Sequence, residues 1–177
     1  MNSVEVLVHQ VIQTLLTRKQ TVSFAESCTG GQLSARITET PGVSAVYMGS
    51  VVSYANEAKV EILGVGPSTL QSEGAVSQIV AQEMAQGVRH RFHTDWGVSI
   101  TGIAGPTGGS VHKPVGTVWV AVAGPCLANS KSKIERQDLS SGDQYSQTLS
   151  ETFLEARKCF FKGDRKQIQA QSVLAAL

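Results

Sequence analysis

The chain contains the stretch Ala25-Glu26-Ser27-Cys28-Thr29-Gly30-Gly31, which separates an expected strand from an expected helix. Residues 21–25 before it are typical of a short strand, and Leu33 and Ile37 after it are spaced as on one face of a helix. A helix start presents unpaired backbone N–H groups, and its dipole favours negative charge. The stretch is therefore interpreted as an active-site turn that can hold an oxyanion or a phosphate.

Two kinds of role remain open for the side chains of this turn. Gly30 and Gly31 allow the backbone to approach a ligand closely, and Ser27 carries a hydroxyl that can act as a nucleophile. Alternatively, Ser27 or Thr29 only caps the following helix, which serine and threonine do routinely.

Outward from this stretch, strand and helix patterns alternate along the chain. Helical spacing is expected over 4–16, after residue 31, over 56–63 and over 77–88, and strand patterns over 45–54, 96–101 and 115–123. Gly66-Pro67-Ser68 is expected to form a loop, residues 131–139 another strand, and residues from Ser141 a helix with Tyr145, Leu149, Phe153, Ala156 and Phe160 on one face. This alternation predicts an α/β fold with a mostly parallel sheet.

The bulk properties narrow the class of protein. With 177 residues, 41% of them apolar, the chain is expected to form one domain over 1–165 with a helical tail over 166–177. A net charge of +1 gives no basis for binding nucleic acid or a membrane surface. No signal sequence is recognised, so we expect a cytoplasmic protein. Three cysteines without close spacing favour neither a disulfide framework nor a zinc site.

Three polar or glycine-rich segments follow directly on expected strands, at 27–31, 54–59 and 101–109. If these strands are parallel, the segments meet at the carboxyl edge of the sheet, where ligands of open α/β sheets bind. Lys59 is the candidate base for Ser27, because burial can lower the pKa of a lysine, although an exposed helix lysine is the plain alternative. Tyr54 and Thr101 could relay a proton or only pack. Cys28 could replace Ser27 as nucleophile.

The remaining candidate sites are less specific. The glycine-rich segment with Gly102, Gly105, Gly108 and Gly109 lacks the lysine and hydroxyl residue of a P-loop, so it either binds a phosphate through backbone N–H groups or forms a tight turn. His90 and His93 have no accompanying carboxylate at a recognisable spacing, and no metal site is predicted.

Several motifs together resemble the CinA C-terminal domain family, over about residues 7–161. They are Ala25–Gly31, Tyr54-Ala55-Asn56-Glu57-Ala58-Lys59, Gly74-Ala75-Val76-Ser77, Ser99-Ile100-Thr101-Gly102-Ile103-Ala104-Gly105-Pro106 with Gly108-Gly109, and Lys113-Pro114-Val115-Gly116-Thr117-Val118. That family includes nicotinamide-nucleotide amidases, which hydrolyse the carboxamide of nicotinamide mononucleotide to the acid and ammonia.

The resemblance implies a fold and a mechanism. The fold would be a three-layer α/β/α sandwich with a mostly parallel or mixed central sheet, commonly assembled as a homo-oligomer. Its substrate would be a small pyridine nucleotide or related amide, and it would need no metal or other cofactor. Ser27 would be the nucleophile, Lys59 its base, and Tyr54 and Thr101 would assist. The backbone around Thr29 to Gly31 would form the oxyanion hole, beside Cys28.

One position departs from the family pattern. Where active members have Ser-Gly-Asp-Arg and another arginine a few residues later, this chain has Ser141-Gly142-Asp143-Gln144. Arginine is the natural bidentate partner of a phosphate, which Gln144 cannot replace. Either the substrate differs, or the chain is a weakly active paralogue that binds a nucleotide or a partner protein in a regulatory role. A third possibility is that Arg136 or a neighbouring subunit supplies the charge.

Overall fold

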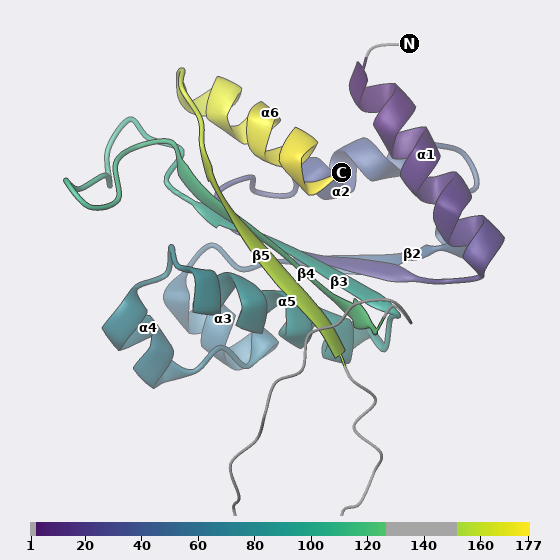
Figure 1. The fold of residues 1–177 in the computed structure, drawn as a ribbon, viewed down its shortest axis with the longest axis horizontal. Coiled ribbons are helices and arrows are strands. Elements are labelled where there is room, and N and C mark those ends of the chain that lie inside the picture. The colour runs from purple at the N-terminus through teal and green to yellow at the C-terminus, as the bar shows by residue number, and fades with distance from the viewer. Residues whose placement is uncertain (1–2, 127–151) are drawn as a thin grey trace, which may run out of the picture.

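The computed structural model describes residues 3–126 and 152–177. Its elements in chain order are α1 (Ser3–Arg18), β1 (Val22–Glu26), α2 (Gln32–Thr38), the 3-10 turn η1 (Val43–Ala45), β2 (Tyr47–Val52), α3 (Asn56–Leu63), α4 (Pro67–Glu73), α5 (Gln78–Phe92), β3 (Trp96–Gly102), β4 (Thr117–Pro125), β5 (Thr152–Phe160) and α6 (Arg165–Ala176). Helices cover both faces of one central sheet (Figure 1). The predicted three-layer α/β/α sandwich is confirmed.

The central sheet is mixed, with the strand order β2-β1-β3-β4-β5. Strands β2, β1 and β3 are parallel, whereas β4 runs antiparallel to both β3 and β5. Hence the three strands that precede the candidate segments all point the same way, which was the condition for those segments to meet.

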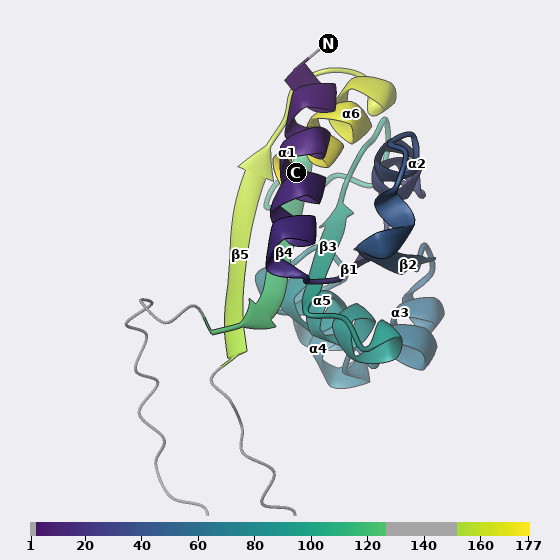
Figure 2. The ribbon, with the colours of Figure 1, turned by 90° about the vertical axis from the view of Figure 1, so that its right-hand side faces the viewer.

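The two faces of the sheet have separate apolar layers. Helices α1, α2 and α6 lie on one face, and α3, α4 and α5 on the other (Figure 2). Ile12, Leu33, Ile37 and Ile168 are buried in the first layer with side chains of the strands. On the opposite face, Val80, Met84 and Val88 of α5 pack with Leu63 of α3.

The predicted helix through Phe153, Ala156 and Phe160 is wrong for the part that the structure describes. Residues 152–160 form strand β5, which pairs with β4 from Thr117 opposite Phe160 to Pro125 opposite Thr152. Helical spacing of a few apolar residues is a weak signal, and pairing with a neighbouring strand outweighs it. The strand expected over 131–139 and the start of that helix lie outside the described residues.

The structure refines the sequence prediction in two further segments. The expected loop at Gly66-Pro67-Ser68 contains the start of α4, because proline is well tolerated as the first residue of a helix. The expected helical tail is α6, whose Ile168 and Val173 are buried in the core.

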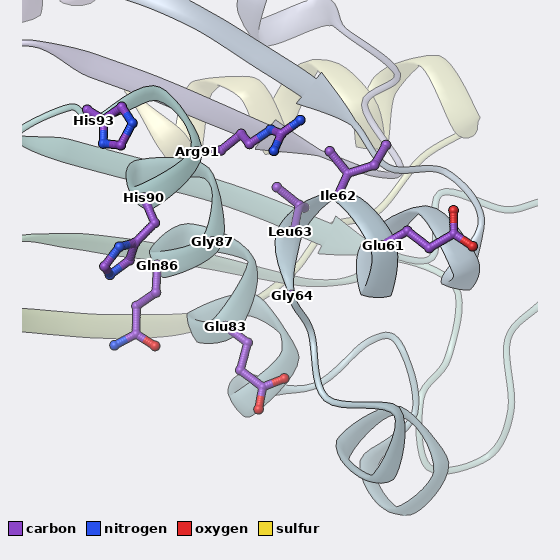
Figure 3. Close-up of a pocket in the computed structure, with 10 residues that line it drawn as sticks. All are labelled: Glu61, Ile62, Leu63, Gly64, Glu83, Gln86, Gly87, His90, Arg91 and His93. Carbon is purple, nitrogen blue, oxygen red and sulfur yellow. The ribbon is translucent and has the colours of Figure 1, made fainter. Parts of the chain in front are cut away.

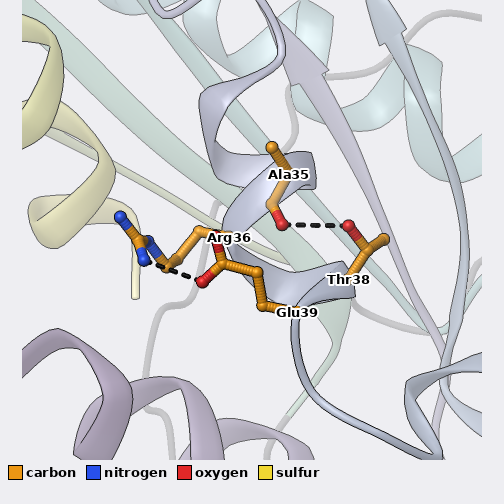
Figure 4. A network of polar contacts seen from close by, with 4 residues as sticks. All are labelled: Ala35, Arg36, Thr38 and Glu39. Atoms are coloured by element: carbon orange, nitrogen blue, oxygen red, sulfur yellow. Dashed lines mark hydrogen bonds and ion pairs between the residues drawn. The ribbon is translucent and has the colours of Figure 1, made fainter.

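The ion pair at the end of α2 is a surface contact that contributes little to the stability of this fold. At the end of α2, Arg36 pairs with Glu39 at 2.7 Å and the Thr38 hydroxyl donates to the Ala35 carbonyl (Figure 4). Both ends of this ion pair are solvent-exposed, so we expect it to contribute less than about 1 kcal/mol.

None of the described helices is both long enough and apolar enough to cross a bilayer.

We predict that Gly87→Ala destabilises the protein. Alanine usually stabilises the interior of a helix relative to glycine by about 0.5–1 kcal/mol. Here a Cβ at Gly87 of α5 would lie 1.9 Å from the Leu63 carbonyl oxygen at the end of α3, so the two helices would have to separate. The expected loss is about 1–3 kcal/mol in the free energy of unfolding, measured by urea denaturation.

The control is Gln86→Ala on the same helix, which we expect to change the unfolding free energy by less than about 0.5 kcal/mol. A Gly87→Ala protein at least as stable as the wild type would contradict the close approach of α3 and α5.

Candidate active site

The three candidate segments leave the sheet at one edge. Glu26, the last residue of β1, is in register with Val52 of β2 and with Ile100 of β3. The Ser27 N–H donates to the Ile100 carbonyl at 3.0 Å, and the Ser53 N–H donates to the Glu26 carbonyl at 2.8 Å. These bonds hold Ser27, which follows β1, and Ser53, which follows β2, beside each other.

Ser27 and Lys59 meet at this edge. Lys59 lies in the first turns of α3, and its Nζ is 3.1 Å from Ser27 Oγ. The same Nζ donates to the Ser53 carbonyl at 2.6 Å. Only 1% of Lys59 and 8% of Ser27 is exposed, so Lys59 is not the exposed helix lysine that was the plain alternative.

Burial changes the chemistry of the lysine. Loss of solvation lowers the pKa of Lys59 from its ordinary value of 10.5, opposed by the nearby Cys28. No described carboxylate pairs with the amine to restore its charge; its two partners are a hydroxyl and a carbonyl. A neutral amine at this distance can accept the proton of the Ser27 hydroxyl.

The thiol of Cys28 is less suited to act as nucleophile. Burial raises the pKa of Cys28 to about 11, which leaves the thiol protonated near neutral pH. Its Sγ lies against Gly102, where an added Cβ would be 3.1 Å away. These observations favour Ser27 over Cys28.

The hypothesis that Ser27 or Thr29 caps α2 is wrong. The N-cap residue is Gly31, with φ of 97°, and the helix begins at Gln32. Instead, the Glu26 carboxylate accepts hydrogen bonds from the N–H groups of Gly31, Leu33 and Ser34 at 2.9–3.1 Å. Ser27 therefore lies five residues before the first residue of the helix, and its hydroxyl does not cap that helix.

Hydrogen bonds within the turn reduce the number of backbone N–H groups that the predicted oxyanion hole around Thr29 to Gly31 can use. The N–H of Gly30 donates to the Ser27 carbonyl at 3.2 Å and that of Gly31 to Glu26 at 3.0 Å. Within the described residues, no carbonyl or carboxylate oxygen accepts the N–H of Cys28 or Thr29. The Thr29 hydroxyl is also buried without a partner there. The N–H of Cys28 contacts the sulfur of its own side chain, which is a weak acceptor, and that of Thr29 has no acceptor among the described residues. These two N–H groups are therefore the donors that remain for an oxyanion.

Tyr54 and Thr101 do not hydrogen-bond to the Ser27–Lys59 pair. The Thr101 hydroxyl donates to the Ala75 carbonyl at 2.8 Å and thereby fixes the connection between α4 and α5. Tyr54 is 62% exposed, and its hydroxyl accepts a hydrogen bond from Arg165 at 2.8 Å. Thr101 therefore has a satisfied hydroxyl, whereas Tyr54 lies where a ligand could reach it.

The glycines after β3 have packing reasons to be glycine. A Cβ at Gly105 would lie 2.6 Å from Val115, and one at Gly109 would lie 2.8 Å from the Val115 nitrogen. Gly108 has φ of 86°, which favours glycine over other residues. These contacts favour the tight turn over a phosphate cradle.

Arg165 is a site residue that the sequence analysis missed. As the first residue of α6 it donates to the Tyr54 hydroxyl and to the Gly105 carbonyl, both at 2.8 Å. Its charge acts on the Cys28 thiol and partly offsets the rise in that pKa. Arg165 therefore lies beside the turn that carries Ser27.

A sequence signal for Arg165 was available. Gly163-Asp164-Arg165 contains the Gly-Asp-Arg triplet that was sought at Gly142-Asp143-Gln144. Asp164 caps α6 by accepting the Gln167 N–H at 2.9 Å, which places the arginine at the helix start. Gln144 itself lies outside the described residues.

The groove between α3 and α5 is separate from this site. It has a volume of about 730 Å³ and includes Glu83, His90 and His93 in its lining, but neither Ser27 nor Lys59 (Figure 3). In the part of the chain that the structure describes, no cluster of three or more His, Cys, Asp or Glu residues could hold a metal ion.

Comparison with known proteins identifies relatives of this chain. The CinA C-terminal domain model matches residues 4–148. A CinA-like protein of Fervidobacterium nodosum is 52% identical over 131 residues, 73% of this chain. A second CinA-like protein, of Thermosynechococcus vestitus, is 56% identical over 115 residues, 65% of this chain. The matched regions make up only 32% and 28% of these two relatives.

Solved structures show the same fold. The competence/damage inducible protein CihA of Agrobacterium tumefaciens has a TM-score of 0.82 at 33% identity, over 99% of this chain and 92% of that one. The competence damage-inducible protein A of Klebsiella pneumoniae has a TM-score of 0.79 at 30% identity, over the same shares.

We predict that Lys59 makes the stability of the protein depend on pH. Because its pKa is lower in the folded chain than in the unfolded one, the folded chain binds fewer protons between that lowered value and 10.5. The free energy of unfolding then rises with pH across this interval, by about 1.4 kcal/mol for each unit of the shift.

Urea denaturation of the wild type and of Lys59→Met, from about pH 7 to about pH 10, measures this dependence. The wild type should gain stability relative to Lys59→Met as the pH rises. The contribution of Cys28 is present in both proteins and largely cancels. A difference between the two that stays constant with pH would show that Lys59 keeps its ordinary pKa.

Proposed function

Because the chain belongs to the CinA C-terminal domain family, we propose that it hydrolyses the carboxamide of nicotinamide mononucleotide, or of a related small amide, by a serine–lysine mechanism. The observation that supports this most strongly is the buried Lys59 amine 3.1 Å from Ser27 Oγ. A lysine with a lowered pKa next to a serine hydroxyl is an arrangement that activates a nucleophile without histidine.

In the first half of the proposed reaction, Ser27 Oγ attacks the carboxamide carbon while the Lys59 amine takes its proton. The N–H groups of Cys28 and Thr29 donate to the oxyanion of the tetrahedral intermediate. Collapse of this intermediate breaks the C–N bond, and Lys59 returns the proton to the nitrogen, which leaves as ammonia. Ser27 then carries the acyl group as an ester.

In the second half, water attacks the ester and Lys59 again takes the proton. The carboxylic acid leaves and Ser27 Oγ regains its proton from Lys59. The sum is amide plus water to acid plus ammonia, and every step uses groups of this chain and water alone.

Substrate recognition is assigned to Arg165. Its two partners, the Tyr54 hydroxyl and the Gly105 carbonyl, are neutral, and no carboxylate of residues 3–126 or 152–177 forms an ion pair with it. A guanidinium in this state can bind the phosphate of a nucleotide in bidentate fashion. Arg165 would thus provide the charge that Gln144 lacks, and the exposed ring of Tyr54 offers a face for the pyridinium.

We expect the purified protein to release ammonia from nicotinamide mononucleotide. Ser27→Ala should lower the rate at least about 1,000-fold because the nucleophile is lost. The matched variant of the next residue, Cys28→Ala, should retain activity within about tenfold, because its thiol takes no part.

Ammonia release that persists in Ser27→Ala would contradict the nucleophile assignment. No release by the wild type, from this substrate or from related amides, would favour a regulatory binding protein with the same fold.

We also expect Arg165 to determine the preference for a phosphorylated substrate. Arg165→Gln should reduce the ratio of kcat/KM for nicotinamide mononucleotide to that for nicotinamide riboside by about 10- to 100-fold, since a charge-assisted bond to the phosphate is lost. Steady-state kinetics on both substrates measures this ratio.

Lys166→Gln removes a charge from the adjacent exposed position and serves as control; it should leave the ratio unchanged. If Arg165→Gln also leaves it unchanged, Arg165 does not recognise the phosphate.

A further inference from the structure

Glu26 is a buried carboxylate that the proposed mechanism does not use. It is the last residue of β1, directly before Ser27, and none of its surface is exposed. Besides the three N–H groups at the start of α2, it accepts a bond from the Ser34 hydroxyl at 2.6 Å. All four donors are neutral, and no described lysine or arginine pairs with this carboxylate.

These contacts close the segment 27–31 into a loop with both ends on one residue. The backbone of Glu26 is paired with β2 and β3, which fixes the start of the loop. Its carboxylate binds Gly31 at the end of the loop and Leu33 and Ser34 just beyond it. The sheet thus holds the Ser27 end of the loop through the bond to Ile100, and the Glu26 side chain holds the Gly31 end.

The same contacts determine which backbone donors are available. Because Glu26 accepts the N–H groups of Gly31 and Leu33, the beginning of α2 is not available to a substrate. The N–H groups of Cys28 and Thr29, the two residues that follow Ser27, have no oxygen acceptor among the described residues. A carboxylate can accept on both oxygens, whereas a glutamine side chain would turn an NH₂ group toward one set of donors.

We propose that Glu26 is a positioning residue, which holds the turn 27–31 so that Ser27 Oγ stays within reach of Lys59 and the N–H groups of Cys28 and Thr29 face the substrate. This inference rests on the part of the proposed function that makes Ser27 the nucleophile. It does not depend on which amide is hydrolysed.

The test compares Glu26→Gln with Glu83→Gln. Glu83 is a matched control, because its carboxylate also accepts bonds at the start of a helix, from the Gly66 N–H at 3.0 Å and the Thr69 hydroxyl at 2.9 Å, but at α4. Three quantities are measured: the rate at which a fluorophosphonate labels Ser27, the hydrogen exchange of the peptide covering 27–34, and ammonia release from nicotinamide mononucleotide.

We expect Glu26→Gln to slow labelling of Ser27 by about 100-fold, as displacement of a reacting group by about 1 Å can do. Ammonia release should fall through kcat, with KM changed less than about threefold. Exchange in 27–34 should become at least about tenfold faster. Glu83→Gln should change none of these quantities by more than about twofold, even if both variants lower the thermal midpoint equally.

If Glu26→Gln does not fold, Ser34→Ala replaces it. This variant removes one donor to Glu26 and keeps the carboxylate, so a milder fall in labelling of about three- to tenfold is expected. Labelling within twofold of the wild type in the folded variant, or unchanged exchange in 27–34, would overturn the positioning role.

The labelling rate separates this inference from the proposed function. A wild type that is labelled at Ser27 but releases no ammonia would contradict the amidase proposal while the ratio of labelling rates still decides the role of Glu26. A wild type that is not labelled would overturn both, because Ser27 would then not be a nucleophile.

Discussion

The burial of Lys59 is the constraint on which the candidate site depends. An ammonium group in this position has lost most of its hydration, and no carboxylate in the described part of the chain pairs with it, so its pKa is lowered. The Ser53 carbonyl and Ser27 Oγ are its hydrogen-bond partners. Burying the Lys59 amine without a carboxylate partner lowers the stability of the fold. The same burial lowers the pKa of the amine and thereby suits it to proton transfer, a combination that is common at catalytic sites.

The sheet supplies the precision that such a pair needs. Because β1, β2 and β3 are parallel and in register at Glu26, the residues that follow them emerge side by side. Glu26 then ties the turn after β1 to the start of α2, and α6 brings Arg165 to Tyr54 from the far end of the chain. Secondary structure from both halves of the sequence thus converges on one edge.

Alternating strand and helix patterns predicted the α/β class, because these periodicities are short-range signals. The three-layer arrangement and the roles of Ser27 and Lys59 were implied by the resemblance to the CinA C-terminal domain family, whereas the residues alone left a helix cap and an exposed lysine as alternatives. Local pattern did not predict β5, whose structure follows from pairing with β4. Nor did it identify the Glu26 carboxylate as the acceptor for the N–H groups at the start of α2, because an acidic residue at the end of a strand does not indicate that its side chain reaches past the next turn. Arg165 was missed because the Gly-Asp-Arg triplet was sought 21 residues earlier, at Gly142, rather than at Gly163.

The most direct test of the account is an NMR titration of the Lys59 side chain, followed at its ε-carbon and assigned by comparison with Lys59→Arg. We expect a midpoint clearly below 10.5 in the folded protein, because burial disfavours the charged amine. A midpoint at or above 10.5 would mean that Lys59 remains an ammonium group at working pH. It could then hold Ser27 in place but could not take its proton.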